Sequence, residues 1–407
     1  MNAAGIIVEY NPLHMGHVHL LRETRRILGE DTAILCCMSG DFVQRGDFAI
    51  LRRQARAKAA VQSGADLVLE LPLPWAVSSA EGFARGAVET LLSTNVLTHL
   101  AFGSECGDGA ALLRTAAALQ SEDFPALLRQ ELKVGDSFAA ARERSVGKRL
   151  SPEDAALLQS PNNILGIEYC KALLGCKSAV EPLTIRRVGA AHDAKEAQGT
   201  IASASAIRTL LKEGEQALSL MAPAMKEAYL EEKAAGRAPV LWQNSERAIL
   251  ARLRSMRRED FAALDQGKEG LYNRLYEASR TAAGVEELLD AAKTKRYAYA
   301  RLRRMVLWAY LGLKPAEIPQ HPVYLRPLAM NDRGRAVLAK MRKEAALPIL
   351  TKPADVRRLG PEAQRLFAME AAAADLYSLS YPDLAAARGD VLWKEGPVLL
   401  QGERSLL

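Results

Sequence analysis

Three of the six histidines in this 407-residue chain lie within residues 8–21, "VEYNPLHMGHVHLL", at positions His14, His17 and His19. Imidazoles gathered in one turn can ligate a metal, pack as buried polar groups, or donate hydrogen bonds to a phosphate. Two histidines of one helix that share a metal are usually four residues apart, whereas His14 and His17 are three apart. No cluster of Cys, His or carboxylate residues elsewhere offers an obvious third ligand. We therefore expect no metal site, and we expect His19 to be a surface or packing residue.

Phosphate binding fits the HxGH spacing better. The residues before the turn are typical of a strand, and a helix is predicted from about His17. The free N–H groups at the start of a helix attract anions, and Gly16 lets the backbone approach a ligand closely. Two imidazoles can then donate to phosphate oxygens where charge builds during displacement at phosphorus. The alternative is that each histidine merely caps or packs.

A second polar motif, "IASASAIR", occupies residues 201–208 and precedes a predicted helix. Ser203 and Ser205 can cap that helix and offer hydroxyl groups to a phosphate, and Arg208 adds a fixed positive charge. Taken alone, this motif is as easily an ordinary N-cap.

The elements around these motifs alternate between strand and helix. Apolar runs at residues 3–10, 32–38, 66–72, 97–102 and 181–189 are separated by helical patterns, which favours a parallel sheet with helices on both faces. Ligands of such sheets bind beyond the carboxyl ends of the strands, where both motifs fall. The loop "SGDFVQRGD" after the second strand carries Asp41 and Arg45, which are either solvated or face the cleft. Glu9 and Asn11 can orient His14 or contact a ribose.

Composition sets the class of protein. With 49% hydrophobic and 25% charged residues, the chain is typical of a globular protein, and its length suggests two domains. We predict an α/β domain over residues 1–214 and a mainly helical, basic domain over residues 215–407. There is no apolar run of roughly 18 residues, no secretory leader and no paired cysteine spacing. We therefore expect a cytoplasmic protein with no membrane partner and no evident protein partner.

The formal net charge is +6, and its distribution tells more than the total. The run "AAKTKRYAYARLRR", residues 291–304, contains tyrosines and no acid, as a surface that follows a phosphate backbone would. A solvated helix face is the alternative. The predicted RNA-binding residues are Lys293, Lys295, Arg296, Arg301, Arg303 and Arg304.

The histidine turn after a first strand resembles the signature of HIGH-type nucleotidylyltransferases and class I aminoacyl-tRNA synthetases. The serine-rich second motif is similar to that of the nucleotidylyltransferase branch. More closely, "GIIVEYNPLHMGHVHLL", "MSGDFVQRGDFAI", "GADLVLELP", "FGSE", "SPNNILGIEY", "RRVGAAHD" and "SASAIR" resemble, in order, the bacterial tRNA(Met) cytidine acetate ligase family. That family commonly has Phe and Asn where this chain has Leu13 and Met15, a difference that bears on the packing of the turn.

The resemblance implies a Rossmann-like nucleotidylyltransferase fold and a two-step reaction. Acetate attacks the α-phosphate of ATP to give acetyl-adenylate, and N4 of the wobble cytidine of elongator tRNA(Met) then takes the acetyl group. His14, His17, Ser205 and Arg208 are the implied catalytic residues, with Mg²⁺ accompanying ATP. The implied nucleotide contacts are Ile7, Val8, Glu9, Tyr10, Asn11, Pro12, Leu13, His14, Met15, Gly16, His17, Val18, His19, Leu20, Gly103, Asn162, Arg187 and Ser203.

Two other functions remain open from the sequence. A nucleotidylyltransferase acting on a small phosphate ester would use the same histidine turn, and a non-catalytic RNA-binding protein could retain the fold. The long helical half argues against the first, and the intact motifs argue against the second.

Overall fold

The structure is a computed structural model that describes residues 2–134, 137–187, 203–213, 215–264, 270–294 and 297–401. Side chains are described for these residues except 212, 213, 215 and 216. The predicted strand end at Val188–Gly189, and Lys295 and Arg296 of the basic run, lie outside the described residues.

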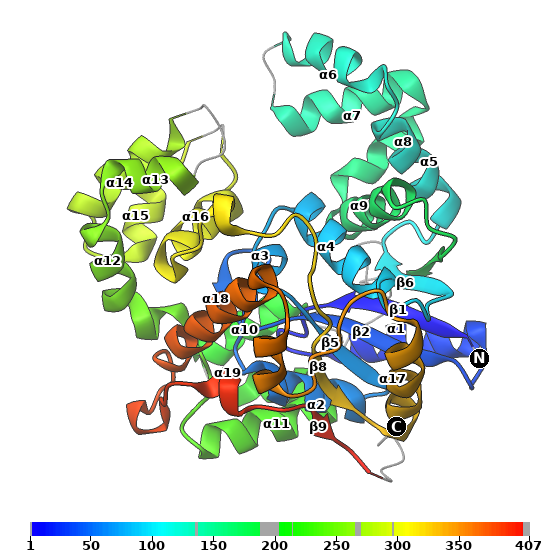
Figure 1. Cartoon of the computed structure of the whole chain (residues 1–407). Helices are drawn as coiled ribbons and strands as arrows, with labels where there is room; N and C mark the ends of the chain where they lie inside the picture. Colours follow the sequence, from blue (N-terminus) through cyan, green and yellow to red (C-terminus); the bar gives the residue numbers. More distant parts are fainter. Residues whose placement is uncertain are drawn as a thin grey trace.

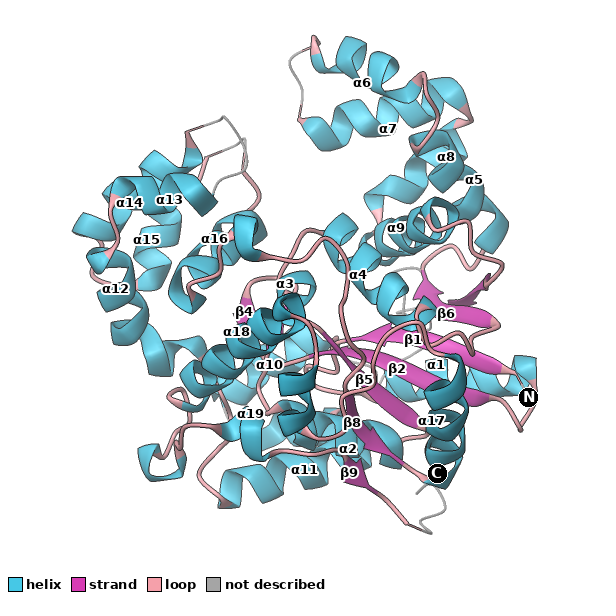
Figure 2. Cartoon of the chain, in the orientation of Figure 1, coloured by secondary structure: helices cyan, strands magenta, loops and turns pink. Residues whose placement is uncertain are grey.

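Seven strands form one sheet in the order β7-β6-β1-β2-β5-β8-β9 (Figure 2). Neighbouring strands from β7 to β5 run parallel, β8 runs antiparallel to β5, and β9 runs parallel to β8. The strands are β1 (Ala3–Val8), β2 (Ala33–Ser39), β5 (Leu67–Leu71), β6 (His99–Ser104), β7 (Glu181–Arg186), β8 (Pro327–Met330) and β9 (Val398–Leu399), and a separate hairpin comprises β3 (Phe42–Val43) and β4 (Asp47–Phe48).

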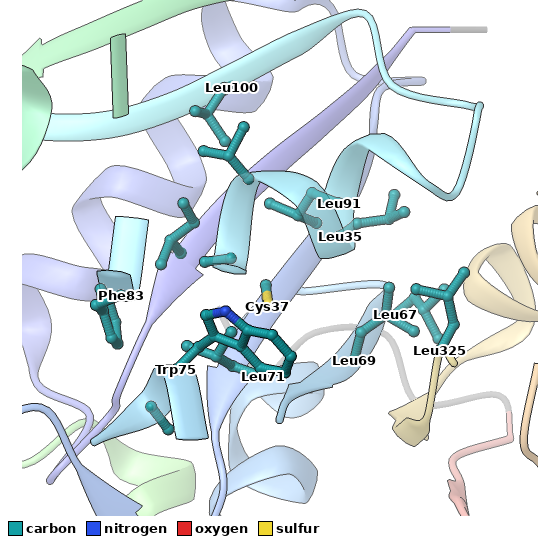
Figure 3. Packing of buried hydrophobic residues seen from close by; sticks show 14 of the residues in the cluster. Leu35, Cys37, Leu67, Leu69, Leu71, Trp75, Phe83, Leu91, Leu100 and Leu325 are labelled. Atoms are coloured by element: carbon teal, nitrogen blue, oxygen red, sulfur yellow. The ribbon is translucent and has the colours of Figure 1, made fainter. Parts of the chain in front are cut away.

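Side chains of the central strands alternate between two buried layers, as the period of two in a strand requires. Leu35, Cys37 and Leu69 face one layer, to which Trp75 of α3 also belongs (Figure 3). Helices α4, α9 and α18 complete this layer. Ile34, Cys36 and Val68 face the opposite layer, with α1, α2, α10 and α11. Helices thus cover both faces, which confirms the predicted α/β fold class.

The helices lie along the chain in the order shown in Figure 1. Their bounds are α1 (Met15–Leu28), α2 (Arg53–Gln62), α3 (Leu73–Ala76), α4 (Ala80–Leu92), α5 (Gly109–Leu119), α6 (Phe124–Leu132), α7 (Phe138–Arg149), α8 (Pro152–Ala156), α9 (Pro161–Gly175), α10 (Ala204–Glu213), α11 (Pro223–Ala234), α12 (Glu246–Ser255), α13 (Arg258–Leu264), α14 (Leu271–Thr281), α15 (Val285–Ala292), α16 (Tyr299–Leu311), α17 (Asp332–Glu344), α18 (Pro361–Ser378) and α19 (Val391–Lys394). Short 3₁₀ helices occupy Leu157–Gln159, Glu215–Leu220, Trp242–Ser245, Pro315–Glu317, Pro353–Arg358 and Leu384–Ala386.

The second half of the chain contributes strands to the sheet as well as a group of helices. Helices α12–α16 share a hydrophobic core of their own, to which the β3–β4 hairpin and α18 also contribute. The tail then returns to the sheet, where β8 pairs with β5 and β9 pairs with β8 (Figure 1). The sheet therefore draws on both sides of the predicted boundary at residue 214, and the division into two domains stays a prediction.

The segment "SPNNILG" contains a helix start. Ser160 separates the 3₁₀ helix Leu157–Gln159 from α9, which begins at Pro161. Proline is favoured in the first turn of a helix, because its missing N–H is one that the helix would leave unpaired and its fixed φ suits the helix. The motif marks a helix start, and it brings Asn162 to that start.

Candidate active site

A cavity of about 400 Å³ opens at the carboxyl ends of β1 and β6. Its walls come from the β1–α1 turn, the β3–β4 hairpin, the start of α9 and the start of α10, together with Arg187 just after β7. The sequence-predicted residues that line it are Ile7, Val8, Glu9, Tyr10, Asn11, His14, His17, Leu20, Gly103, Asn162, Arg187, Ser203, Ser205 and Arg208. Segments nearly 200 positions apart in sequence therefore meet in one cavity.

The two histidines lock the first turn of α1. The Nδ1 atom of His14 accepts from the N–H of Gly16 at 3.1 Å, and the Nδ1 atom of His17 accepts from the N–H of His14 at 3.2 Å. This reciprocal arrangement is a capping box built from imidazoles. The rings stack with centroids 3.9 Å apart. Because both Nδ1 atoms accept, each neutral ring carries its proton on Nε2, as a donor on the opposite edge.

These rings are neutral in the free protein at physiological pH. Burial, with a smaller effect of Arg187, lowers the pKa of His14 to about 4. Burial also lowers the pKa of His17 well below its ordinary value, with further contributions from His14 and Arg187. The pair thus offers two N–H donors and no permanent charge. Such donors stabilise charge that develops on a phosphate without repelling each other beforehand.

The other predicted nucleotide contacts in the turn and in α1 do not line the cavity. They are Pro12, Leu13, Met15, Gly16, Val18 and His19. Leu13 is fully buried in the layer beneath α1, Val18 is nearly so, and Met15 packs against this cluster. His19 lies on α1 and outside the cavity.

A buried guanidinium fixes the strand ends beside the turn. Arg56 of α2 is fully buried and donates to the carbonyls of Glu9, Ser39, Gly40 and Leu51. Glu9 follows β1, and Ser39 and Gly40 lie at the end of β2, so one side chain joins the carboxyl ends of the two central strands. Four carbonyl acceptors satisfy a charge that would otherwise be costly to bury. Arg56 therefore positions the loops that form the cavity.

The second motif contributes a cap and a cation. Ser203 Oγ accepts from the N–H of Ala206 at 3.2 Å, so this serine caps α10. Arg208 donates from Nη1 to the carbonyl of Asn11 at 2.6 Å and from Nη2 to Ser205 Oγ at 3.2 Å. The Arg208 guanidinium therefore joins the two motifs, and both of these acceptors are neutral.

The opposite wall is held by β6 and α9. Glu105 accepts from the backbone N–H groups of Asn162 and Asn163 at 3.2 and 2.7 Å and from Asn162 Nδ2 at 2.6 Å. A carboxylate at a helix N-terminus satisfies free N–H groups and suits the helix dipole. A Cβ on Gly103 would lie 3.2 Å from Cγ of Arg187, so the Arg187 side chain runs close over this glycine.

The β3–β4 hairpin supplies residues that were only partly anticipated. Arg45 lines the cavity, in line with the cleft-facing alternative. Asp41 is neither solvated nor in the cavity: it is buried and paired with Arg53. Gln44 donates its N–H to Glu9 Oε1 at 2.7 Å, and burial raises the pKa of Glu9 against the opposing effects of this bond and of Arg208. Asn11 Oδ1 accepts from Ile50 N–H at 2.8 Å, which holds the turn to the chain after the hairpin.

The apolar part of the cavity could not be recognised from the sequence. Phe83 of α4, Phe102 of β6, Leu165 and Tyr169 of α9 line it, together with Val43, Gln44, Asp47, Pro161 and Ala204. Aromatic residues at helical spacing look the same in sequence whether they face a core or a ligand. Phe102 is the exception, because it lies next to Gly103 near the end of β6. The rule that ligands bind beyond the carboxyl ends of parallel strands could have identified it.

The described residues of the basic run lie outside this cavity. Lys293 donates to the carbonyls of Thr294 and Tyr297, and Arg303 pairs with Asp47 of the hairpin at 3.1 Å. Arg301 and Arg304 line a neighbouring cavity. The RNA-binding role of these residues stays a prediction.

Within the described residues there is no group of three or more His, Cys, Asp or Glu placed to hold a metal ion. The carboxylates that line the cavity are engaged, Glu9 with the Gln44 N–H and Asp47 with Arg303. A Mg²⁺ ion that arrives with ATP would therefore be held chiefly by phosphate and water oxygens, as is common for this ion. No described helix is both long and apolar enough to cross a bilayer. All five cysteines have free thiols.

A parallel sheet with a histidine turn after β1 and a serine–arginine motif facing it defines a nucleotide-binding protein of the HIGH class. In agreement, the profile described as HIGH Nucleotidyl Transferase matches residues 1–390. The tRNA(Met) cytidine acetate ligase of Acetivibrio thermocellus is 36% identical over 401 residues, covering 95% of this chain and 96% of that protein. The enzyme of the same name from Caldanaerobacter subterraneus is 38% identical, with 96% and 98% covered.

Solved structures agree with these relatives. Thermotoga maritima TmcAL bound with alpha-thio ATP superposes with a TM-score of 0.91 at 32% identity, covering 99% of this chain and all of that one. The apo form of the same protein gives a TM-score of 0.93. The chain belongs to the tRNA(Met) cytidine acetate ligase family of HIGH nucleotidyl transferases.

Proposed function

We propose that this protein activates acetate with ATP and transfers the acetyl group to N4 of the wobble cytidine of elongator tRNA(Met). The observation that carries the proposal is the cavity in which His14, His17 and Arg208 converge at the carboxyl edge of the sheet. The name shared by relatives that match nearly the whole chain supports the substrate. We expect a cytoplasmic location, because an enzyme that modifies tRNA needs access to it.

In the first step, acetate attacks the α-phosphate of ATP and pyrophosphate leaves. Acetate is already ionised at neutral pH, so this step needs no general base. The Nε2–H groups of His14 and His17 donate to phosphate oxygens, assisted by the start of α1. Arg187 and Arg208, with Ser203 and Ser205, neutralise the triphosphate from the other side of the cavity. A Mg²⁺ ion that accompanies ATP would supply further positive charge.

In the second step, the cytidine amine attacks the acetyl carbonyl of acetyl-adenylate, and AMP leaves with the bonding electron pair. The mixed anhydride is reactive, so the contribution required of the protein is to position the amine and to exclude water. The apolar wall of Phe83, Phe102 and Tyr169 suits a base and keeps bulk water from the anhydride.

The test is an assay with purified protein, ATP, labelled acetate and transcribed elongator tRNA(Met), followed by digestion to nucleosides. We expect label in N4-acetylcytidine, no label when the wobble position is uridine, and exchange of pyrophosphate into ATP that depends on acetate. Turnover of ATP that requires a small phosphate ester in place of tRNA would indicate a nucleotidylyltransferase instead. RNA binding without any ATP turnover would indicate a non-catalytic protein.

A further inference from the structure

One carboxylate lies among the cations of the candidate active site with an oxygen to spare. Glu9 follows β1, is half-buried and lines the cavity. Its Oε1 atom accepts from the N–H of Gln44 at 2.7 Å, whereas its Oε2 atom accepts no hydrogen bond from a described residue. The other described carboxylate of the cavity is Asp47, whose Oδ1 accepts from the N–H of Phe48 and whose Oδ2 pairs with Arg303. Only Glu9 therefore has a carboxylate oxygen left for a ligand.

The surroundings of Glu9 place it at the phosphate end of the cavity. The positive charges of Arg208 and Arg45 act on it, and Arg208 donates to the carbonyl of Asn11, two residues further along the turn. A carboxylate repels phosphate oxygens, so its free oxygen must meet an N–H or O–H donor of a ligand. The adenine of ATP is separated from the α-phosphate by the ribose, and the acetyl carbonyl is joined to that phosphate. Glu9 is thus close to the reacting centre.

Two amide groups near Glu9 lack acceptors. Nδ2 of Asn11 and Nε2 of Gln44 are buried without a hydrogen-bond partner among the described residues, and both residues line the cavity. The orientation of the Asn11 amide is fixed, because its Oδ1 accepts from the N–H of Ile50 at 2.8 Å. A buried donor without an acceptor is costly, so an acceptor supplied by a ligand would stabilise each amide.

One free acceptor with donors beside it matches the Watson–Crick edge of cytosine. The N4 amine is the donor that a glutamate accepts from, and N3 and O2 are acceptors for amide N–H groups. Uracil has the acceptor O4 in the place of N4, and a carboxylate would repel it. Such a site distinguishes cytidine from uridine through one side chain.

The second step of the proposed reaction also needs a proton acceptor. The N4 lone pair attacks the acetyl carbonyl carbon, the bond from that carbon to the phosphate oxygen breaks, AMP leaves with the bonding pair, and N4 loses one proton. His14 and His17 present donors to the ligand, because both Nδ1 atoms already accept from backbone N–H groups. Burial raises the pKa of Glu9, which makes its carboxylate a stronger base than that of an exposed glutamate.

The β3–β4 hairpin connects Glu9 with α16. Gln44 donates its N–H to Glu9, and its carbonyl accepts from Nη1 of Arg304 at 3.3 Å. Asp47 of the same hairpin pairs with Arg303 at 3.1 Å. Both arginines belong to the basic run for which RNA binding is predicted. RNA bound there would lie on the Glu9 side of the cavity.

We propose that Glu9 binds the N4 amine of the target cytidine through Oε2 and accepts the proton that N4 loses during acetyl transfer. Asn11 and Gln44 donate to the ring acceptors of the same base. The proton passes from Glu9 to water after AMP has left. This inference rests on the proposed function, because it requires a cytidine as the acetyl acceptor.

The experiment measures the two steps separately in the wild type and in Glu9→Gln. The first is acetate-dependent exchange of pyrophosphate into ATP, and the second is single-turnover transfer from synthetic acetyl-adenylate to transcribed elongator tRNA(Met). Glutamine keeps an acceptor for the Gln44 N–H, so exchange should stay within about threefold of the wild type, whereas transfer should fall about 10²-fold or more. Glu227→Gln, at an exposed position of α11 outside the cavity, is the matched control and should change neither rate. Thermal unfolding checks the fold of both variants.

Binding of anticodon stem-loops tests the contact to the base without any chemistry. The wild type should bind a stem-loop with cytidine at the wobble position about tenfold more tightly than one with uridine. Glu9→Gln should lose this preference, because an amide can donate to O4 of uracil.

Transfer by Glu9→Gln at the wild-type rate, or an unchanged preference for cytidine, would overturn the inference. A loss of exchange as large as the loss of transfer would also overturn it, because Glu9 would then serve ATP or its Mg²⁺. If the wild type transfers no acetyl group but prefers cytidine, and Glu9→Gln does not, the proposed function fails and the contact between Glu9 and the base stands.

Discussion

Two charged regions at the carboxyl edge of the sheet are built in opposite ways. In the first, which we call the buried network, Arg53 pairs with Asp41 and with Glu70, and Glu70 pairs with Arg326 at 2.8 Å. All four side chains are at most 5% exposed. In the candidate active site, Arg45, Arg187 and Arg208 have no ion pair with a described carboxylate, and the two histidines are neutral.

The difference separates a structural role from a binding role. Within the buried network every charge is balanced by a neighbour, so no charge is left to bind a ligand. The packing also requires a glycine at position 40, because a Cβ on Gly40 would lie 2.6 Å from Glu70 Oε1. The candidate active site holds an excess of cations and N–H donors, which a triphosphate would complete. Both regions contain arginines held in defined positions. They differ in whether the opposing negative charge belongs to the protein or to a ligand.

The largest expected effect is on stability. Arg53→Met leaves Asp41 and Glu70 buried with one partner fewer, and removing one member of a buried ion pair costs about 3–5 kcal/mol. Urea denaturation should show this loss. Arg26→Met, which removes an exposed arginine paired with Glu23, should leave the denaturation midpoint almost unchanged, because water and salt screen an exposed pair. Adding Asp41→Asn to Arg53→Met should recover part of the stability, and a fully additive double variant would show that the network is not coupled.

The next effect is on catalysis. His17→Asn can retain an acceptor for the capping box but removes the Nε2–H donor, and loss of one such donor costs about 10²–10³-fold in kcat. We expect this loss in acetate-dependent pyrophosphate exchange, with little change in thermal stability. His19→Asn, on the same helix and outside the cavity, is the control. Equal rates for the two variants would remove His17 from the proposed mechanism.

The smallest expected effect is a pH dependence of the folding stability, caused by a carboxyl group near Glu70 of the buried network. Glu370 of α18 accepts from Leu73 N–H at 3.0 Å and from the Tyr324 hydroxyl at 2.6 Å. Burial and the nearby charge of Glu70 raise the pKa of Glu370 to about 7. Because the folded state then holds this proton more tightly than the unfolded state, stability falls as pH rises from about 4.5 to about 7, by roughly 1–3 kcal/mol.

Glu370→Gln should flatten that part of the stability profile, measured by denaturant midpoints from pH 5 to pH 7.5. Glu362→Gln, at an exposed position in the first turn of the same helix, should leave the slope as in the wild type. An unchanged slope in Glu370→Gln would mean that this carboxyl group is ionised in the folded protein throughout the range.

Much of the α/β layer could be predicted from the sequence, because its signals are local. Apolar runs of strand length, turn residues and helix periodicity identify β1, β2, β5, β6 and β7 and place the motifs at their carboxyl ends. The pairing of β8 with β5 could not be predicted, since this antiparallel pair joins residues about 260 positions apart and leaves no local pattern.

Residues whose role depends on distant partners could not be assigned. Asp41 sits in a polar loop like any solvated acid, and only the folded chain shows Arg53 against it. Arg45, four residues later, faces the cavity instead. The sequence identified the loop but could not tell which of its charges is internal. Arg56 is a similar case, because nothing in a basic helix signals that one guanidinium will be fully buried.

The late return of the tail to the sheet has a consequence for synthesis on the ribosome. Until residues 327–330 emerge, β5 is an edge strand with unpaired backbone groups, although β2, its other neighbour, was made about 290 residues earlier. Exposed edges of this kind promote aggregation. During this interval the nascent chain already contains every described residue that lines the candidate active site, but its sheet is open at β5, and a chain truncated at residue 214 would keep that edge permanently.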